Sequence, residues 1–151
     1  MFQTIRVIVL RFADYKERAR LLTVLTEKGE KIVVTAYSHG GYTEPFSCSE
    51  MTMRSRRGKW ELKEASTITE FIGLRKSYEK FGLAAYMAKI AETVADSDVP
   101  EPDLFRLLAR GYDTLAKIDT PEIAAFQTAF ESRIAELAGF ASFDEIREHL
   151  I

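Results

Sequence analysis

Four positively charged side chains lie close together around a glycine, at Arg54, Arg56, Arg57 and Lys59. Such a group can hold phosphates, because each Lys or Arg that contacts a phosphate releases condensed counterions. A turn at Arg57-Gly58 would place these cations at the tip of a β-hairpin. The tip of a hairpin is exposed and charged in many proteins, so the pattern leaves a solubilising role open beside nucleic-acid binding.

The alternation of residues before this turn assigns two faces to the strand. With a period of two, Thr52, Arg54 and Arg56 share one face, and Met51 and Met53 point to the other. We therefore expect the arginines to lie together, on the side away from the methionines.

Aromatic rings and further lysines add to this candidate nucleic-acid site. Tyr37, His39 and Tyr42 surround a pair of glycines in a long loop, where rings could stack on splayed bases or simply pack. Lys28 and Lys31 flank a glycine turn, and they are explained equally well as DNA contacts or as solubilising residues of a hairpin.

Other reactive or aromatic side chains are more simply explained as structural. Trp60 shares its strand face with Leu62, which favours a place in a barrel core over a stacking platform. Cys48 lies in a strand and is explained as a small core residue. His39 and His149 lie in different halves with no acid at the spacing of metal ligands. We therefore predict no metal site, no cofactor and no enzymatic activity.

Length, composition and charge favour one compact unit or two lobes. The chain has 151 residues, of which 46% are hydrophobic. It has no long apolar stretch and no signal region, so we expect a soluble, cytoplasmic protein, and its single cysteine excludes an internal disulfide. Residues 1–72 carry 12 Lys and Arg against 9 Asp and Glu, whereas residues 73–151 carry 9 against 14. The more basic first half suits a polyanionic partner.

The first half has the spacing of β-strands, with short runs of β-branched and aromatic residues between turn residues. Five strands in a meander with one longer loop favour an OB-fold β-barrel over a sandwich, and an SH3-like barrel is the near alternative. The expected strands cover residues 4–12, 20–26, 31–37, 46–56 and 59–70.

From Gly73 onward the apolar residues recur with a helical period. The first helix carries apolar residues on two sides, including Tyr78 and Phe81, and should be central. Pro102 and Pro121 start the next two helices, and a short last helix follows. The whole is an α+β protein in which a small α-helical bundle packs against the barrel. The expected domains are the OB-fold barrel, residues 1–72, and the helical domain, residues 73–151.

Segments in both halves carry the pattern of a known family. In the first half these are Ile8–Arg11 with Asp14-Tyr15, then Leu21–Glu27, then Glu44–Phe46. Further along the chain these are Ala65–Phe71, Ala84–Met87, Pro102–Phe105 and Phe130–Phe140. In their order and spacing they resemble the RecO family of bacterial recombination mediators over nearly the whole chain.

The resemblance implies a function in DNA repair and DNA recombination. It implies an OB-fold that binds single- and double-stranded DNA and promotes the annealing of complementary strands. It further implies that the protein works with RecR and the single-stranded DNA-binding protein to load recombinase onto gaps.

Two features depart from the family pattern. Residues 38–43 contain no cation where the family has a basic loop, and the chain stops at Ile151, before the family's zinc segment and C-terminal extension. The chain is then either a fragment or a naturally short relative. A protein-interaction adaptor of the recombination or replication machinery, without strong DNA binding, stays open as the alternative.

Overall fold

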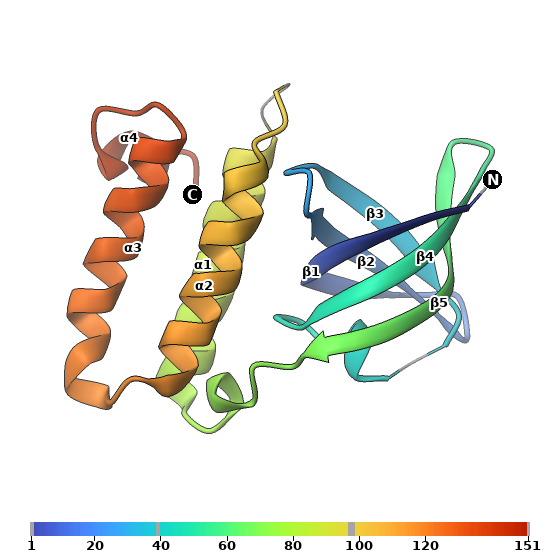
Figure 1. Cartoon of the computed structure of the whole chain (residues 1–151), viewed down its shortest axis with the longest axis horizontal. Coiled ribbons are helices and arrows are strands. Elements are labelled where there is room, and N and C mark those ends of the chain that lie inside the picture. The colour runs from blue at the N-terminus through green and yellow to red at the C-terminus, as the bar shows by residue number, and fades with distance from the viewer. Residues whose placement is uncertain (1, 39, 97–98, 151) are drawn as a thin grey trace.

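A computed structural model of the chain describes residues 2–38, 40–96 and 99–150. A barrel of five strands lies beside a layer of helices, as Figure 1 shows. The α+β class and the OB-like barrel predicted from the sequence are confirmed. The strands are β1 (Phe2–Tyr15), β2 (Ala19–Thr26), β3 (Lys31–Ala36), β4 (Cys48–Arg56) and β5 (Lys59–Thr69).

The barrel closes in the order β1-β2-β3-β5-β4. The long strand β1 pairs with β4 along its first half and with β2 along the rest. Strands β3 and β5 pair in parallel, through Val34 with Trp60 and Thr35 with Glu61. This is the OB-fold order. A simple meander, in which β5 would return to β1, does not form.

The middle of strand β1, residues 7–10, is buried on both faces, which explains its continuous apolar run. Val7 and Val9 belong to the cluster inside the barrel, whereas Ile8 and Leu10 belong to the cluster shared with the helices. Successive side chains of a strand point to opposite faces. The wall of the barrel therefore serves two cores at once.

The helices begin where the sequence offers caps. Ser77 precedes α1, and its hydroxyl accepts a hydrogen bond from the backbone N–H of Lys80 at 3.2 Å. Pro102 occupies the first turn of α2, where its missing N–H costs no helical hydrogen bond. The helices are α1 (Tyr78–Ala95), α2 (Pro102–Lys117), α3 (Ile123–Leu137) and α4 (Phe143–Arg147), with 3₁₀ turns η1 (Gly41–Thr43), η2 (Ile72–Arg75) and η3 (Thr120–Glu122).

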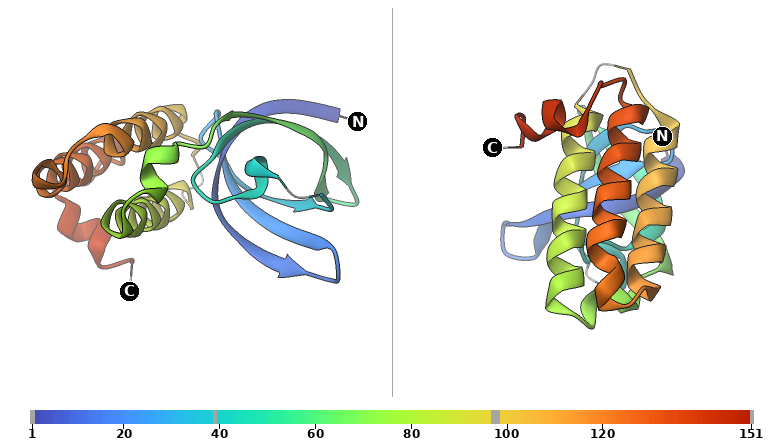
Figure 2. Two further views of the ribbon diagram at one scale, coloured as in Figure 1. Left: turned by 90° about the horizontal axis from the view of Figure 1, so that it is seen from below. Right: turned by 90° about the vertical axis from the view of Figure 1, so that its left-hand side faces the viewer.

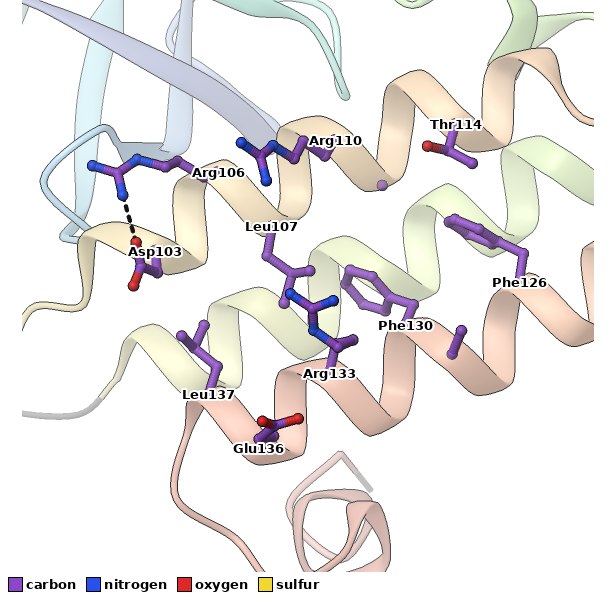
Figure 3. A pocket seen from close by; sticks show the side chains of 12 residues that line it. Asp103, Arg106, Leu107, Arg110, Thr114, Phe126, Phe130, Arg133, Glu136 and Leu137 are labelled. Atoms are coloured by element: carbon purple, nitrogen blue, oxygen red, sulfur yellow. Dashed lines mark hydrogen bonds and ion pairs between the residues drawn. The ribbon is translucent and has the colours of Figure 1, made fainter.

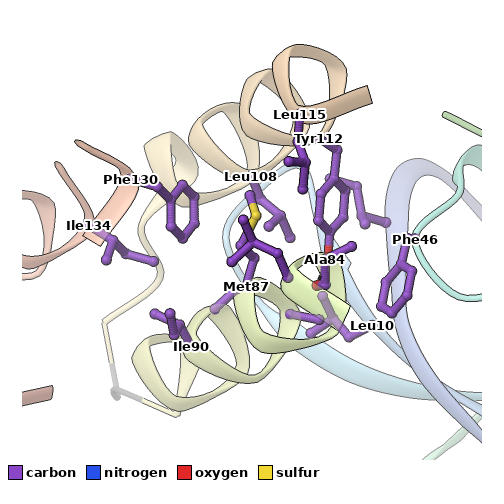
Figure 4. Packing of buried hydrophobic residues seen from close by; sticks show 14 of the residues in the cluster. Leu10, Phe46, Ala84, Met87, Ile90, Leu108, Tyr112, Leu115, Phe130 and Ile134 are labelled. Carbon is purple, nitrogen blue, oxygen red and sulfur yellow. Dashed lines mark hydrogen bonds between the residues drawn. The ribbon is translucent and has the colours of Figure 1, made fainter. Parts of the chain in front are cut away.

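The pair α1 and α2 lies against the barrel, and α3 packs on the side of this pair that is turned away from it (Figure 2). Figure 4 shows the shared core, in which Leu10 and Phe46 of the barrel face Met87 and Tyr112 of the helices. The rings of Phe46 and Tyr112 meet edge to face with their centroids 5.7 Å apart. The buried hydroxyl of Tyr112 donates a hydrogen bond to the carbonyl oxygen of Ala84 at 2.9 Å. The helical bundle is thus packed against the barrel, as expected.

The apolar face of α1 is narrower than the sequence predicts. Leu83, Met87 and Ile90 are buried, but Tyr78 is 98% exposed and Phe81 is 40% exposed. Part of the second predicted face therefore stays in solvent.

Candidate nucleic-acid interface

A surface hollow of about 770 Å³ lies at the end of the barrel. The turn between β1 and β2 and the turn between β4 and β5 border it, and both turns lie on the side of the barrel away from the helices (Figure 1). We call it the tip hollow. Its charged and aromatic lining residues are Lys16, Arg56, Arg57, Lys59, Glu61, Tyr15, Tyr37 and Trp60.

The geometry of the β4–β5 turn explains how three cations come together. Arg56 and Lys59 are opposite each other in the strand pairing, so the loop between them has two residues. Arg57 and Gly58 both have positive φ, at 55° and 76°. Positive φ at both central residues is the type I′ geometry that matches the twist of a hairpin. The turn at Arg57-Gly58 predicted from the sequence is therefore the one that forms.

In the part of the chain that the structure describes, the cations of the tip hollow are not neutralised by neighbouring carboxylates. Among the residues that the structure describes, Lys16, Arg56, Arg57 and Lys59 make no ion pair with an acidic side chain. Glu61 also lines the hollow, and its Oε1 atom lies 3.4 Å from Nη2 of Arg54. Arg54 thus offsets the charge of Glu61 from outside the hollow, and the local balance is positive.

Aromatic rings line the hollow together with the cations. Tyr37, at the end of β3, is 56% exposed. Trp60 is half-buried, because it packs against the interior cluster of the barrel and also lines the hollow. The prediction of a core position for Trp60 is thus met in part, and one part of this side chain stays available at the surface.

Other predicted site residues lie elsewhere or outside the described residues. Lys28 and Lys31 are at the ends of β2 and β3 opposite to the tip hollow, where Lys31 forms ion pairs with Asp96 and with Glu92. The hydroxyl of Tyr42 lies 2.9 Å from that of Ser38, and its ring is not among the lining of the hollow. His39 falls outside the described residues.

Tyr15 and Lys16 line the tip hollow but were not among the residues that the sequence predicted for the site. Tyr15 and Lys16 end β1 and begin its turn, about 40 positions before Arg56 in the chain, and Lys16 Nζ lies 5.0 Å from the centroid of the Tyr15 ring. A cation in a short polar turn is common, so no local signal marked it. The pairing of β1 with β2 and of β3 with β5 brings it beside the hairpin tip.

A second basic surface lies between α2 and α3 (Figure 3). Arg106 and Arg110 project from α2, and Arg133 projects from α3. Arg106 is paired with Asp103 at 2.6 Å. Apolar side chains lie between the arginines. We call this surface the α2–α3 groove, and its apolar lining includes Leu107, Phe126, Phe130 and Leu137.

Reactive side chains do not gather in the described part of the chain. Within residues 2–38, 40–96 and 99–150, no three His, Cys, Asp or Glu side chains are placed to hold a metal ion. Cys48 is 7% exposed, and burial raises the pKa of its thiol to about 11, so the nucleophilic thiolate is disfavoured.

No helix in the described ranges is long and apolar enough to cross a bilayer.

Known proteins match both halves of the chain. A family model described as "Recombination protein O C terminal" matches residues 75–142. The "DNA repair protein RecO" of Pelotomaculum thermopropionicum is 30% identical over 151 residues, which cover 94% of this chain and 57% of that protein. The protein of the same name from Geobacter metallireducens is 29% identical over 143 residues, or 88% of this chain and 57% of its own length. That of Bacillus subtilis is 26% identical over 126 residues, or 79% and 49%. The chain thus spans about half the length of the curated relatives it matches.

Proposed function

The chain belongs to the RecO family of DNA repair proteins, and from this premise we propose that it binds DNA through the tip hollow. The observation that carries the proposal is the convergence of Lys16, Arg56, Arg57 and Lys59 from two separate turns, with no acidic partner among the described residues. Phosphates of a nucleic-acid backbone are the natural counterions of such a group. Strand annealing and the loading of recombinase would build on this contact.

Binding to a labelled oligonucleotide tests the proposal. A strand of about 16 nucleotides matches the upper end of the site sizes of OB-folds. At low ionic strength we expect a rise in fluorescence anisotropy at micromolar protein, with a log–log salt slope near −3, since each phosphate contributes about 0.7 for single strands. No change in anisotropy at about 100 micromolar protein, the weak end of non-specific binding, would contradict the proposal.

Charge-removing substitutions locate the contact. The double variant Arg56→Gln and Lys59→Gln should reduce both the affinity and the salt slope, because two phosphate contacts are lost. Lys76→Gln is the matched control, since Lys76 is an exposed cation beside η2, outside the lining of the tip hollow. Equal losses per charge removed in the two variants would show that the overall charge, and not the hollow, determines binding.

A protein-interaction adaptor is the second candidate function, and the α2–α3 groove favours it. The groove combines Arg110 and Arg133, which have no acidic partner among the described residues, with the rings of Phe126 and Phe130. Positive charge over an apolar surface suits a partner with acidic and apolar side chains. RecR and the single-stranded DNA-binding protein are the partners that the family suggests.

A pull-down with these two proteins separates the candidates. An adaptor should retain its partner in the variant Arg56→Gln and Lys59→Gln, and should lose it in Arg110→Glu and Arg133→Glu, which reverse the charge of the groove. Retention of both partners by the groove variant would exclude this groove as their binding site.

A further inference from the structure

Two buried phenylalanines have a backbone conformation that bulky residues rarely adopt. Phe46 has a φ of 63° and is 4% exposed, and Phe71 has a φ of 47° and is 7% exposed. Positive φ is strained in an L-residue, because the Cβ atom then crowds the backbone. Such residues persist only where the surrounding structure holds them in place. The contacts around Phe46 and Phe71 therefore show what keeps them in this conformation.

Both phenylalanines lie at the end of the barrel that meets the helices. Cys48 pairs with Thr69 in the ladder of β4 and β5. Phe46 precedes this pair by two residues, and Phe71 follows it by two. The ring of each packs edge to face on Tyr112 of α2, with centroids 5.7 and 5.6 Å apart. Tyr112, which Figure 4 shows beside Phe46, thus contacts two separate segments of the barrel end.

One arginine holds the peptide groups that precede both phenylalanines. Arg75 of η2 donates a hydrogen bond from Nη1 to the carbonyl oxygen of Glu70 at 2.7 Å, and another from Nη2 to that of Pro45 at 2.5 Å. Glu70 precedes Phe71, and Pro45 precedes Phe46. Because the peptide group is planar, a change of φ turns the carbonyl group of the preceding residue. The guanidinium therefore fixes φ at both positions, and we call it, with the two carbonyl groups, the Arg75 clamp.

The Arg75 clamp joins the two parts of the molecule where the chain passes from one to the other. The chain crosses from the barrel to the helices at residues 70–77 (Figure 1). The turn η2 is packed on the helices, because a Cβ atom at Gly73 would lie 2.2 Å from the carbonyl oxygen of Ala116 in α2. Pro45 belongs to the barrel, in the segment before β4. Arg75 therefore ties the helical layer back to the barrel.

The energies of the Arg75 clamp are close to balance. Arg75 is exposed, and no acidic side chain in the described ranges forms an ion pair with it. The gain from two hydrogen bonds to a charged donor is of the same order as the strain of two residues with positive φ. Two arrangements of similar free energy are the condition for a hinge that can change state.

We propose that the Arg75 clamp is a conformational lock between the barrel and the helices. With both hydrogen bonds made, Phe46 and Phe71 keep positive φ, and the helical layer stays in the orientation that the structure shows. With both broken, the two phenylalanines relax to negative φ, and the helical layer turns about residues 70–77. This inference does not depend on the proposed function, because none of these residues lines the tip hollow.

The distance between two spin labels tests the orientation of the helical layer. Glu64→Cys on β5 and Ser132→Cys on α3 place one label on each part, at exposed positions, and Cys48 is buried and stays unlabelled. Electron–electron double resonance on the full chain should give one main distance, with a released state of at most about 10%. In Arg75→Ala the ratio of released to clamped molecules should rise at least about tenfold, because two hydrogen bonds to a charged group are lost.

Backbone scalar couplings test the mechanism, because an arginine that merely stabilised the fold would not alter φ in the folded protein. In Arg75→Ala the couplings of Phe46 and Phe71 should change toward those of negative φ. Arg75→Lys keeps the charge but lacks the planar fork that reaches both carbonyl groups, so it should show the same changes. Arg106→Ala is the matched control, since the pair of Arg106 with Asp103 stays within α2.

Far-ultraviolet circular dichroism first establishes that each variant is folded. A single narrow distance and positive φ at both phenylalanines in Arg75→Ala would overturn the inference, since aromatic packing alone would then hold the joint. Equal broadening of the distance in Arg75→Ala and Arg106→Ala would overturn it too. If Arg75→Ala does not fold, Arg75→Lys decides, and an unchanged distance with unchanged φ in that variant would refute the lock.

Discussion

Arg57 and Lys16 hold their charges at backbone positions that a long side chain adopts only with strain. For L-residues the left-handed region costs roughly 1–2 kcal/mol. At these two residues the proposed contacts with phosphates favour a cation, whereas backbone strain disfavours a long side chain. Substitutions in the tip hollow can measure the two effects separately.

The substitution Arg57→Asn should stabilise the protein while it weakens DNA binding. Asn-Gly is the preferred sequence of a type I′ turn, so relief of strain should raise the free energy of unfolding by about 0.5–1 kcal/mol. Urea unfolding of the wild type and the variant measures the change. A destabilised variant would show that Arg57 has a structural role in the turn.

Cys48 supplies a prediction on pH. Burial raises the pKa of its thiol to about 11, above the value of about 8.5 for a free cysteine. The folded state therefore holds the proton more tightly, so the contribution of this group to stability is complete below about pH 8.5 and declines as the pH rises toward 11.

The variant Cys48→Ala isolates this contribution, because the other groups that titrate at high pH remain in both proteins. Its unfolding free energy should fall less steeply than that of the wild type between about pH 8.5 and pH 10.5. Parallel pH curves for the two proteins would refute the assignment.

Some features of the candidate site could be predicted from the sequence, and others could not. The turn at Arg57-Gly58 and the opposite orientation of Met53 follow from local patterns, and both are found. Lys16 lines the hollow beside Arg56, about 40 positions later in the chain. Lys31 forms ion pairs with Glu92 and Asp96, about 60 to 65 positions later. No local pattern encodes contacts of that separation.

At the scale of elements, a carboxylate on α1 ties two strands to the helical layer. Glu92 accepts hydrogen bonds from the guanidinium of Arg11 on β1 at 2.9 and 3.0 Å, and Lys31 on β3 lies 3.6 Å away. The hydrogen bond from Arg11 is the main cause of the lowered pKa of Glu92. This group links α1 to the barrel beyond the apolar contacts.

The variant Glu92→Gln should weaken that link in a pH-dependent manner. A lowered pKa in the folded state means that the carboxylate stabilises the protein above about pH 4.5 and ceases to do so as the pH falls through its folded pKa. We expect a loss of about 1 kcal/mol at neutral pH, because Arg11 is largely exposed, and a smaller loss near pH 3.

Asp113→Asn is the matched control, since the pair of Asp113 with Lys117 at 3.0 Å stays within α2 and both side chains are exposed. Its effect should be about 0.3–0.5 kcal/mol. Equal effects of the two substitutions in thermal unfolding at pH 7 would contradict a linking role for Glu92.

The elements themselves were largely predictable from the sequence. The five strands lie within a few residues of the expected ranges, since turn residues and alternation mark both ends. The order of the strands could not be predicted, because β5 pairs in parallel with β3 on one side while it stays paired with β4 on the other. Only two residue pairs join β3 to β5, and they include Trp60 and Glu61, so this short contact is what shapes the tip hollow.

At the scale of the whole molecule, the barrel and the helices share one core. Leu10 and Leu25 of the barrel belong to the same buried cluster as Leu108 and Ile134 of the helices. Without the helical layer the outer face of β1 would meet water. We therefore predict that the two parts unfold together.

Two spectroscopic signals test this prediction. Trp60 reports on the barrel, and circular dichroism in the far ultraviolet reports mainly on the helices. In urea both signals should change in one coincident transition, as in a two-state protein. Separate midpoints would show that the expected division near residue 72 marks two independent folding units.

The central claim is that DNA binds at the tip hollow, and backbone amide chemical shifts of the labelled protein test it most directly. On titration with a single strand of about 16 nucleotides, we predict shifts centred on Lys16, Tyr37 and residues 56–61, with the helices unaffected. Shifts confined to the α2–α3 groove, or spread evenly over the exposed lysines and arginines, would contradict the account.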